Sequence, residues 1–120
     1  MMRLQIEVEK DCVVMAFGSR GRDLPLSFEQ AEVVAFAVRE KAKACEEWVR
    51  AGGTRAVATE RRGIAVRGSL KDRIVRLTFP EYTDRELIPF EGAVELAKAI
   101  EATLRQLAYK VILRGSGKRE

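Results

Sequence analysis

Hydrophobic and polar residues alternate near the start of the chain. Leu4, Ile6 and Val8 are separated by polar residues, and a second apolar run at 12–17 follows a charged pair at 10–11. A period of two residues is typical of a strand with one buried face. The pattern therefore predicts two antiparallel strands that are joined by a turn.

The pattern then changes to one that predicts a long helix. Ser27 and Gln30 have the spacing of a capping box, in which each side chain bonds to the backbone of the other residue. Apolar residues recur every three or four positions from there to Val49, and two glycines at 52–53 end the pattern. We expect a loop at 18–23 between the second strand and this helix.

The second half of the chain repeats this order at an offset of 62 residues. The apolar positions of the second strand recur at this offset, and FEQA at 28–31 corresponds to FEGA at 90–93. One offset that holds through strand, loop and helix favours a duplication. We therefore predict two ββα units at 3–51 and 64–111, the second with its loop at 80–89.

The order of these elements predicts the fold class. Residues 54–60 alternate enough to form an extra strand, with a hairpin turn at 61–63. The order ββα-β-ββα predicts an α+β fold: a two-layer sandwich with an antiparallel β-sheet and two long helices on one face. A chain of 120 residues forms a single domain, which we place at 1–113, before a flexible basic tail at 114–120.

The first helix carries more apolar residues than one buried face requires. Val33, Phe36 and Trp48 lie outside its core-facing stripe. Such a set is typical of a subunit interface. We predict a homodimer or homotetramer that forms through these residues. The alternative is that the two helices pack against each other through this set.

Composition narrows the possible functions. The chain has no His and no Asn, and it has 15 Arg against 7 Lys. Such a composition is typical of hyperthermophiles. The lack of His removes the commonest general base and the usual zinc ligand, so we expect no enzyme, no metal and no cofactor. With no secretion signal or membrane span, we expect a cytoplasmic protein in which Cys12 and Cys45 are buried thiols, or alternatively form a disulfide.

The distribution of charge indicates a binding surface. The net charge is +4, but residues 50–76 alone carry eight basic and two acidic residues. The strand pattern turns Arg67 and Arg76 away from the helices, and Tyr82 follows in the next loop. A basic sheet face with a nearby aromatic ring is typical of a site for single-stranded nucleic acid. The predicted nucleic-acid-binding residues are Arg55, Arg61, Arg62, Arg67, Lys71, Arg73, Arg76 and Tyr82.

A structural role for the same arginines stays open. Arg67 and Arg76 have an alternative use in ion pairs with Glu7, Glu9 or Glu60 across the sheet. Eight basic residues cannot all be neutralised by two acidic ones in the same segment, which favours an external anion. Tyr82 has the alternative role of covering one edge of the core.

In its small size, lack of His, excess of Arg and strand–helix duplication, the chain resembles the ThermoDBP-related single-stranded DNA-binding proteins of hyperthermophilic archaea. This resemblance implies an oligomer that holds single-stranded DNA, and in some members RNA, in a cleft with basic walls and an apolar floor. The PC4-like and Pur-repeat proteins are also similar, but their repeats have four strands before each helix. We therefore expect a non-catalytic protein that binds single-stranded nucleic acid. The alternatives are an oligomeric protein–protein assembly module and a PC4-like transcription cofactor.

Overall fold

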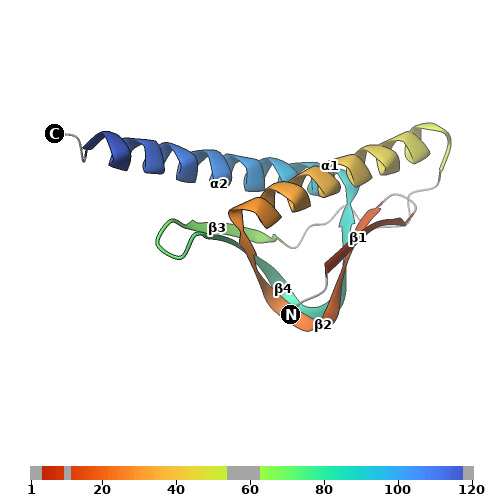
Figure 1. The fold of residues 1–120 in the computed structure, drawn as a ribbon. Helices are drawn as coiled ribbons and strands as arrows, with labels where there is room; N and C mark the ends of the chain where they lie inside the picture. The colour runs from red at the N-terminus through yellow and green to blue at the C-terminus, as the bar shows by residue number, and fades with distance from the viewer. Residues whose placement is uncertain (1–3, 10–11, 54–62, 118–120) are drawn as a thin grey trace.

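Two pairs of strands alternate with two long helices. The computed structural model describes residues 4–9, 12–53 and 63–117, with side chains up to residue 107. Figure 1 shows both helices on the same side of the sheet. The predicted α+β architecture is therefore confirmed. The elements are β1 (Leu4–Glu9), β2 (Cys12–Ser27), α1 (Phe28–Arg50), β3 (Ala65–Ser69), β4 (Ile74–Pro89) and α2 (Phe90–Gly117).

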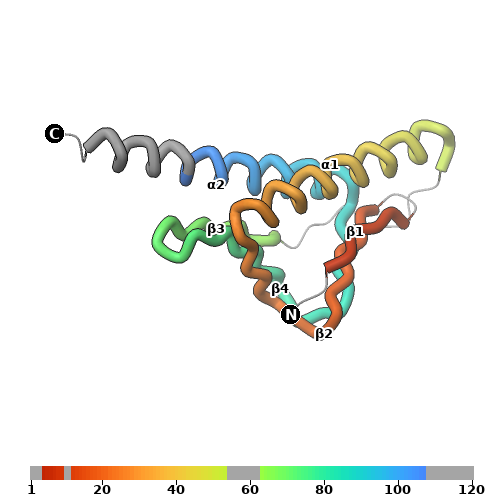
Figure 2. Tube along the Cα trace, in the orientation of Figure 1, coloured from red at the N-terminus to blue at the C-terminus, as the bar shows by residue number. Residues whose placement is uncertain are grey.

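The four strands form an antiparallel sheet in the order β1-β2-β4-β3. β2 pairs with β4 along two stretches, 12–16 with 85–89 and 23–27 with 74–78. The register shifts between these stretches, where each strand has extra residues. Such bulges bend a strand, and Figure 2 shows that β2 and β4 bend together into a U.

The loops predicted at 18–23 and 80–89 are wrong, because both segments belong to the long strands β2 and β4. Each strand continues past its bend, and its second half pairs with the first half of the other strand. Pro25 is compatible with strand structure here, because the second half of β2 has only β4 beside it among the described strands. Glycine and proline indicated turns in the sequence, but here they mark a bend and a sheet edge.

The bounds of the elements bear on the predicted repeat. β2 and β4 both have 16 residues and begin 62 residues apart, as do the two helices. These bounds agree with the predicted offset, and an origin by duplication stays a prediction. The extra strand at 54–60 and most of its hairpin turn lie outside the described residues. α2 continues to Gly117, so residues 114–117 belong to a helix and not to a tail.

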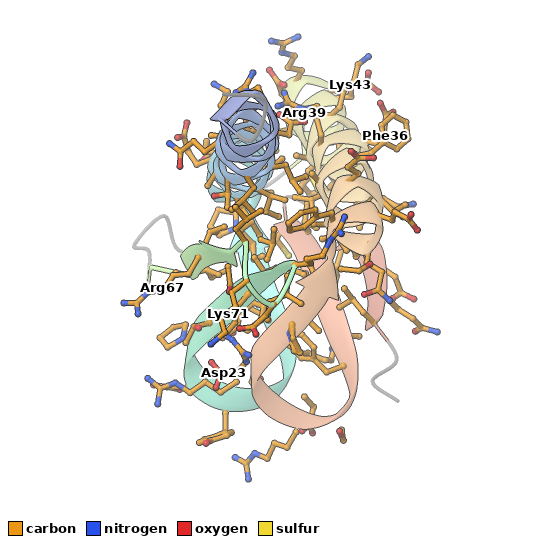
Figure 3. The ribbon with its side chains drawn as sticks, turned by 60° about the vertical axis from the view of Figure 1, so that its left-hand side comes forward. Asp23, Phe36, Arg39, Lys43, Arg67 and Lys71 are labelled. Carbon is orange, nitrogen blue, oxygen red and sulfur yellow. The ribbon has the colours of Figure 1, made fainter. Side chains whose placement is uncertain are left out.

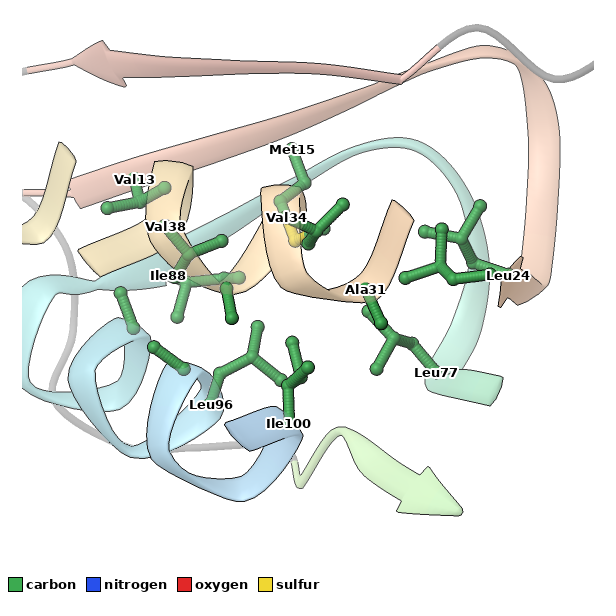
Figure 4. Close-up of a cluster of buried hydrophobic side chains, with 14 of the residues drawn as sticks. Val13, Met15, Leu24, Ala31, Val34, Val38, Leu77, Ile88, Leu96 and Ile100 are labelled. Carbon is green, nitrogen blue, oxygen red and sulfur yellow. The ribbon is translucent and has the colours of Figure 1, made fainter. Parts of the chain in front are cut away.

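The core lies between the helices and the inner face of the sheet. Figure 4 shows Val13 and Met15 of β2 facing Val38 of α1 and Ile100 of α2, and all four side chains are fully buried. Alternate residues in the first half of β4 complete this layer, so the predicted alternation is observed there. In β2 the consecutive residues 12–15 are all buried. The largest fully buried side chain of the core is Phe79.

The start of α1 follows the predicted capping box. The Ser27 hydroxyl accepts a hydrogen bond from the Gln30 backbone N–H at 3.1 Å, and the Gln30 side chain accepts one from the Ser27 N–H at 2.9 Å. Two N–H groups that have no partner within the helix are thereby satisfied. The sequence therefore fixes where β2 ends and α1 begins.

The two helices contact each other beside the core. Buried residues such as Ala42 and Ala97 leave room for close packing, and Arg39 of α1 forms an ion pair with Glu101 of α2. The hydrogen bond and the charge of Glu101 raise the pKa of Arg39 above its usual value. Val33 and Phe36 take no part, because 68% and 66% of their surfaces are exposed. The alternative in which the helices pack through this set is therefore wrong.

Candidate nucleic-acid interface

Two arginines lie directly opposite each other on neighbouring strands. Arg67 of β3 pairs in register with Arg76 of β4, and both side chains are exposed on the outer side of the sheet. Val75 and Leu77, on either side of Arg76, point into the core. Figure 3 shows Arg67 extending away from the molecule. We call this outer surface of β3 and the first half of β4, with the turn that joins them, the arginine face.

The charge of this pair has no partner among the described residues. Neither Arg67 nor Arg76 forms an ion pair within the part of the chain that the structure describes. Like charges directly opposite each other in an antiparallel sheet are unfavourable. An anion between the two guanidinium groups would remove this repulsion, and a guanidinium can bind phosphate through two hydrogen bonds.

The predicted alternative of ion pairing within the sheet applies to another arginine. Arg85 of β4 donates to a carboxylate oxygen of Glu9 at 2.6 Å. Glu7 lies on β1, at the opposite edge of the sheet from Arg67. The alternative is therefore wrong for Glu7 and Glu9, while Glu60 lies outside the described residues.

The turn between β3 and β4 adds two more basic side chains. Lys71 and Arg73 are both exposed. Ser69 and Asp72 stabilise the turn, because the Ser69 hydroxyl is 3.1 Å from the Asp72 carboxylate and accepts from the Asp72 N–H at 3.2 Å. Arg73 has a left-handed backbone with φ of 56°, which is uncommon for a residue with a side chain. Exposed acidic residues here include Asp72 in the turn and Asp23 of β2, which is opposite Thr78.

Tyr82 lies in β4 at the bend and not in a loop. Its side chain is 64% exposed, so the alternative in which it covers the core is not supported. Phe79 is the aromatic residue of β4 that is buried in the core, and the centroid of its ring is 5.0 Å from the centroid of the Phe17 ring. Tyr82 is six residues along β4 from Arg76, in the irregular stretch between the paired residues Thr78 and Thr83. The arginine pair therefore lies in the regular first half of β4, whereas Tyr82 lies at the bend.

The other predicted residues divide into two groups. Arg55, Arg61 and Arg62 lie outside the described residues. Trp48, predicted at the interface with Val33 and Phe36, is only 37% exposed and lies 12 residues beyond Phe36, about 18 Å along a helix. Its ring packs on the backbone of Gly53, where a Cβ atom would be 2.3 Å from the ring. Trp48 is therefore separated from the other two residues.

A groove that the sequence pattern did not predict lies beside the exposed part of α1. It is a hollow of about 720 Å³ between β1, the second half of β2 and the first half of α1. Pro25, which marks a strand at a sheet edge, was a signal that could have indicated it. The residues that line the groove are mainly apolar: Leu4, Ile6, Leu24, Pro25, Leu26, Val33, Val34 and Ala37, with Glu29 and Gln30.

The described residues include no group of three or more acidic or cysteine side chains that could hold a metal ion. Cys12 and Cys45 are buried thiols, and Cys12 donates to the backbone carbonyl of Glu9 at 3.1 Å. Within the described part of the chain, neither helix is long and apolar enough to cross a membrane.

Comparison of the chain with protein-family models, with curated proteins and with solved structures finds no match.

Proposed function

We propose that the protein binds single-stranded nucleic acid through its arginine face and catalyses no reaction. The observation that carries this proposal is the opposed pair of Arg67 and Arg76, whose exposed charges have no partner among the described residues. Lys71 and Arg73 extend the same positive surface at the turn. A phosphate backbone is a regular array of anions that matches such a surface.

The exposed ring of Tyr82 supports a single strand over a duplex. Bases stack on exposed aromatic rings only when they are unpaired, and each such contact contributes about 1–3 kcal/mol. A strand that reaches both Tyr82 and the arginine pair crosses the outer surface from the bend to β3. Phosphate contacts and base stacking are available from both DNA and RNA, so either nucleic acid in the cytoplasm fits the proposal. The proposal also agrees with the resemblance to ThermoDBP-related proteins.

A salt titration tests this proposal. Fluorescence anisotropy with labelled oligo-dT should show affinity that falls with salt, with a log–log slope of about −0.7 for each phosphate neutralised. Arg67→Ala and Arg76→Ala should each weaken binding and make the slope less steep by about one contact. Tyr82→Ala should weaken binding and leave the slope nearly unchanged, because stacking releases few counterions.

Two controls keep the titration specific. Lys98→Ala removes an exposed charge from α2, away from the arginine face, and should leave the slope unchanged. A duplex of equal length should bind more weakly than the single strand. Affinity that does not vary with salt, or equal slopes for all four variants and the parent, would contradict the proposal.

An assembly module is the second candidate function. The exposed Val33 and Phe36 favour it, because two large apolar side chains so close on one helix are unusual for a surface that stays in water. In this case the arginines would only keep the protein soluble. Retention of the protein on immobilised polyanion at moderate salt distinguishes the two functions, because only the first predicts it.

A further inference from the structure

The edge of β1, which has no strand beside it among the described residues, and the exposed side of α1 lie together on one side of the molecule. β1 is an edge strand with β2 as its neighbour in the described sheet. Figure 3 shows that Phe36 points away from α2, and the groove joins β1 to α1 at Ile6 and Val33. We call the surface formed by Leu4, Ile6, Val8, Val33 and Phe36 the edge face.

The edge face has the properties of an unfilled interface. Val8 is 38% exposed, and Val33 and Phe36 are about two-thirds exposed. An exposed apolar edge strand can pair with another strand through its unpaired N–H and C=O groups. The groove beside it has a volume of about 720 Å³, and most of its lining is apolar.

We propose that a second copy of this chain covers the edge face, with the two β1 strands paired antiparallel about a two-fold axis at Ile6. The two sheets then continue into one another, and the two α1 helices lie side by side above them. The interface is isologous, because the same residues contribute from both copies. This inference does not depend on the nucleic-acid proposal, since the arginine face is on β3 at the other edge of the sheet.

Charge selects this register over its neighbours. Residues directly opposite each other in an antiparallel pair lie on the same face of the sheet. The register between the two β1 strands can therefore change only in steps of two residues if Leu4, Ile6 and Val8 of both copies are to stay on one face. An axis at Glu7 would place two carboxylates opposite each other, which is unfavourable. An axis at Ile6 places Gln5 opposite Glu7 and aligns the apolar residues.

Disulfide trapping tests the two-fold axis. In the proposed register Ile6 is opposite Ile6 of the partner, at a Cα separation of about 5 Å that a disulfide can bridge. Ile6→Cys should therefore form a covalent dimer under mild oxidation. Leu4→Cys is the matched control on the same face of the strand, because two copies of Leu4 would be about 13 Å apart, beyond the reach of a disulfide. The parent should not cross-link, since Cys12 and Cys45 are buried.

Sedimentation provides the second measurement and does not depend on new cysteines. The parent should sediment as a dimer of the 13.5 kDa chain, and Phe36→Asp should halve the mass or weaken the dimer at least tenfold. Tyr82→Asp, which changes an aromatic residue of nearly equal exposure on another surface, should leave the mass unchanged. A monomeric parent, or cross-linking of Leu4→Cys as efficient as that of Ile6→Cys, would overturn the inference. A dimer that survives Phe36→Asp would also overturn it.

Discussion

Arginines in this sheet occupy two contrasting environments. Arg85 is satisfied by Glu9 across the strands, whereas Arg67 and Arg76 face each other without a carboxylate among the described residues. A surface charge that only maintained solubility would have no reason to be placed opposite another of the same sign. The difference between these residues is therefore the main evidence for a ligand with negative charge.

This contrast predicts opposite effects of one substitution at two positions. Arg67→Thr should raise the free energy of unfolding by a few tenths of a kcal/mol, because it removes the repulsion from Arg76 and threonine favours strands. Arg85→Thr should lower it by about 0.2–1 kcal/mol, because it breaks an exposed ion pair. Urea unfolding of both variants measures the difference.

Measurements of nucleic-acid binding and stability on the same two variants can also contradict this prediction. Arg67→Thr should also weaken nucleic-acid binding, so that stability rises where affinity falls, as is common at binding sites. If Arg67→Thr destabilises the protein as much as Arg85→Thr does, then Arg67 has a structural partner and the case for an external anion is lost.

Among the elements, helix α1 illustrates what the sequence could predict. The capping box and the spacing of apolar residues are local signals, and both agree with the structure at Ser27 and along the buried stripe to Cys45. The long strands β2 and β4 could not be predicted, because the second half of each strand is held by the first half of the other and not by local sequence. Glycine and proline near each bend resembled loop signals for this reason.

The helix start gives a prediction about stability. Ser27→Ala should lower the free energy of unfolding by about 1 kcal/mol, because the N–H of Gln30 loses its acceptor. Ser19→Ala, at an exposed position in the bend of β2, is the matched control and should have little effect. Thermal unfolding of both variants tests this prediction, and equal melting temperatures would show that the cap does not stabilise the fold.

The candidate site could be predicted only in part. Strand alternation correctly placed Arg67 and Arg76 on the outer side of the sheet, because alternation depends on local sequence. The register that brings them opposite each other depends on pairing between β3 and β4. The groove beside β1 was not predicted, because it arises from the bend of the whole sheet.

At the scale of the whole molecule, the two proposed surfaces are at opposite edges of one sheet. β3 carries the arginine face and β1 the edge face. A dimer formed through β1 leaves both arginine faces exposed, one at each end of the continuous sheet. Binding and assembly are therefore compatible, and each can fail without the other.

An NMR titration of the ¹⁵N-labelled protein with oligo-dT tests directly whether the arginine face binds nucleic acid. We expect the largest amide shifts in β3 and the first half of β4, with smaller shifts near Tyr82. The amides of Val33 and Phe36 should not change, because they lie on the edge face. Shifts confined to α1 and β1, or no shifts at low salt, would contradict the assignment of the arginine face as the nucleic-acid interface.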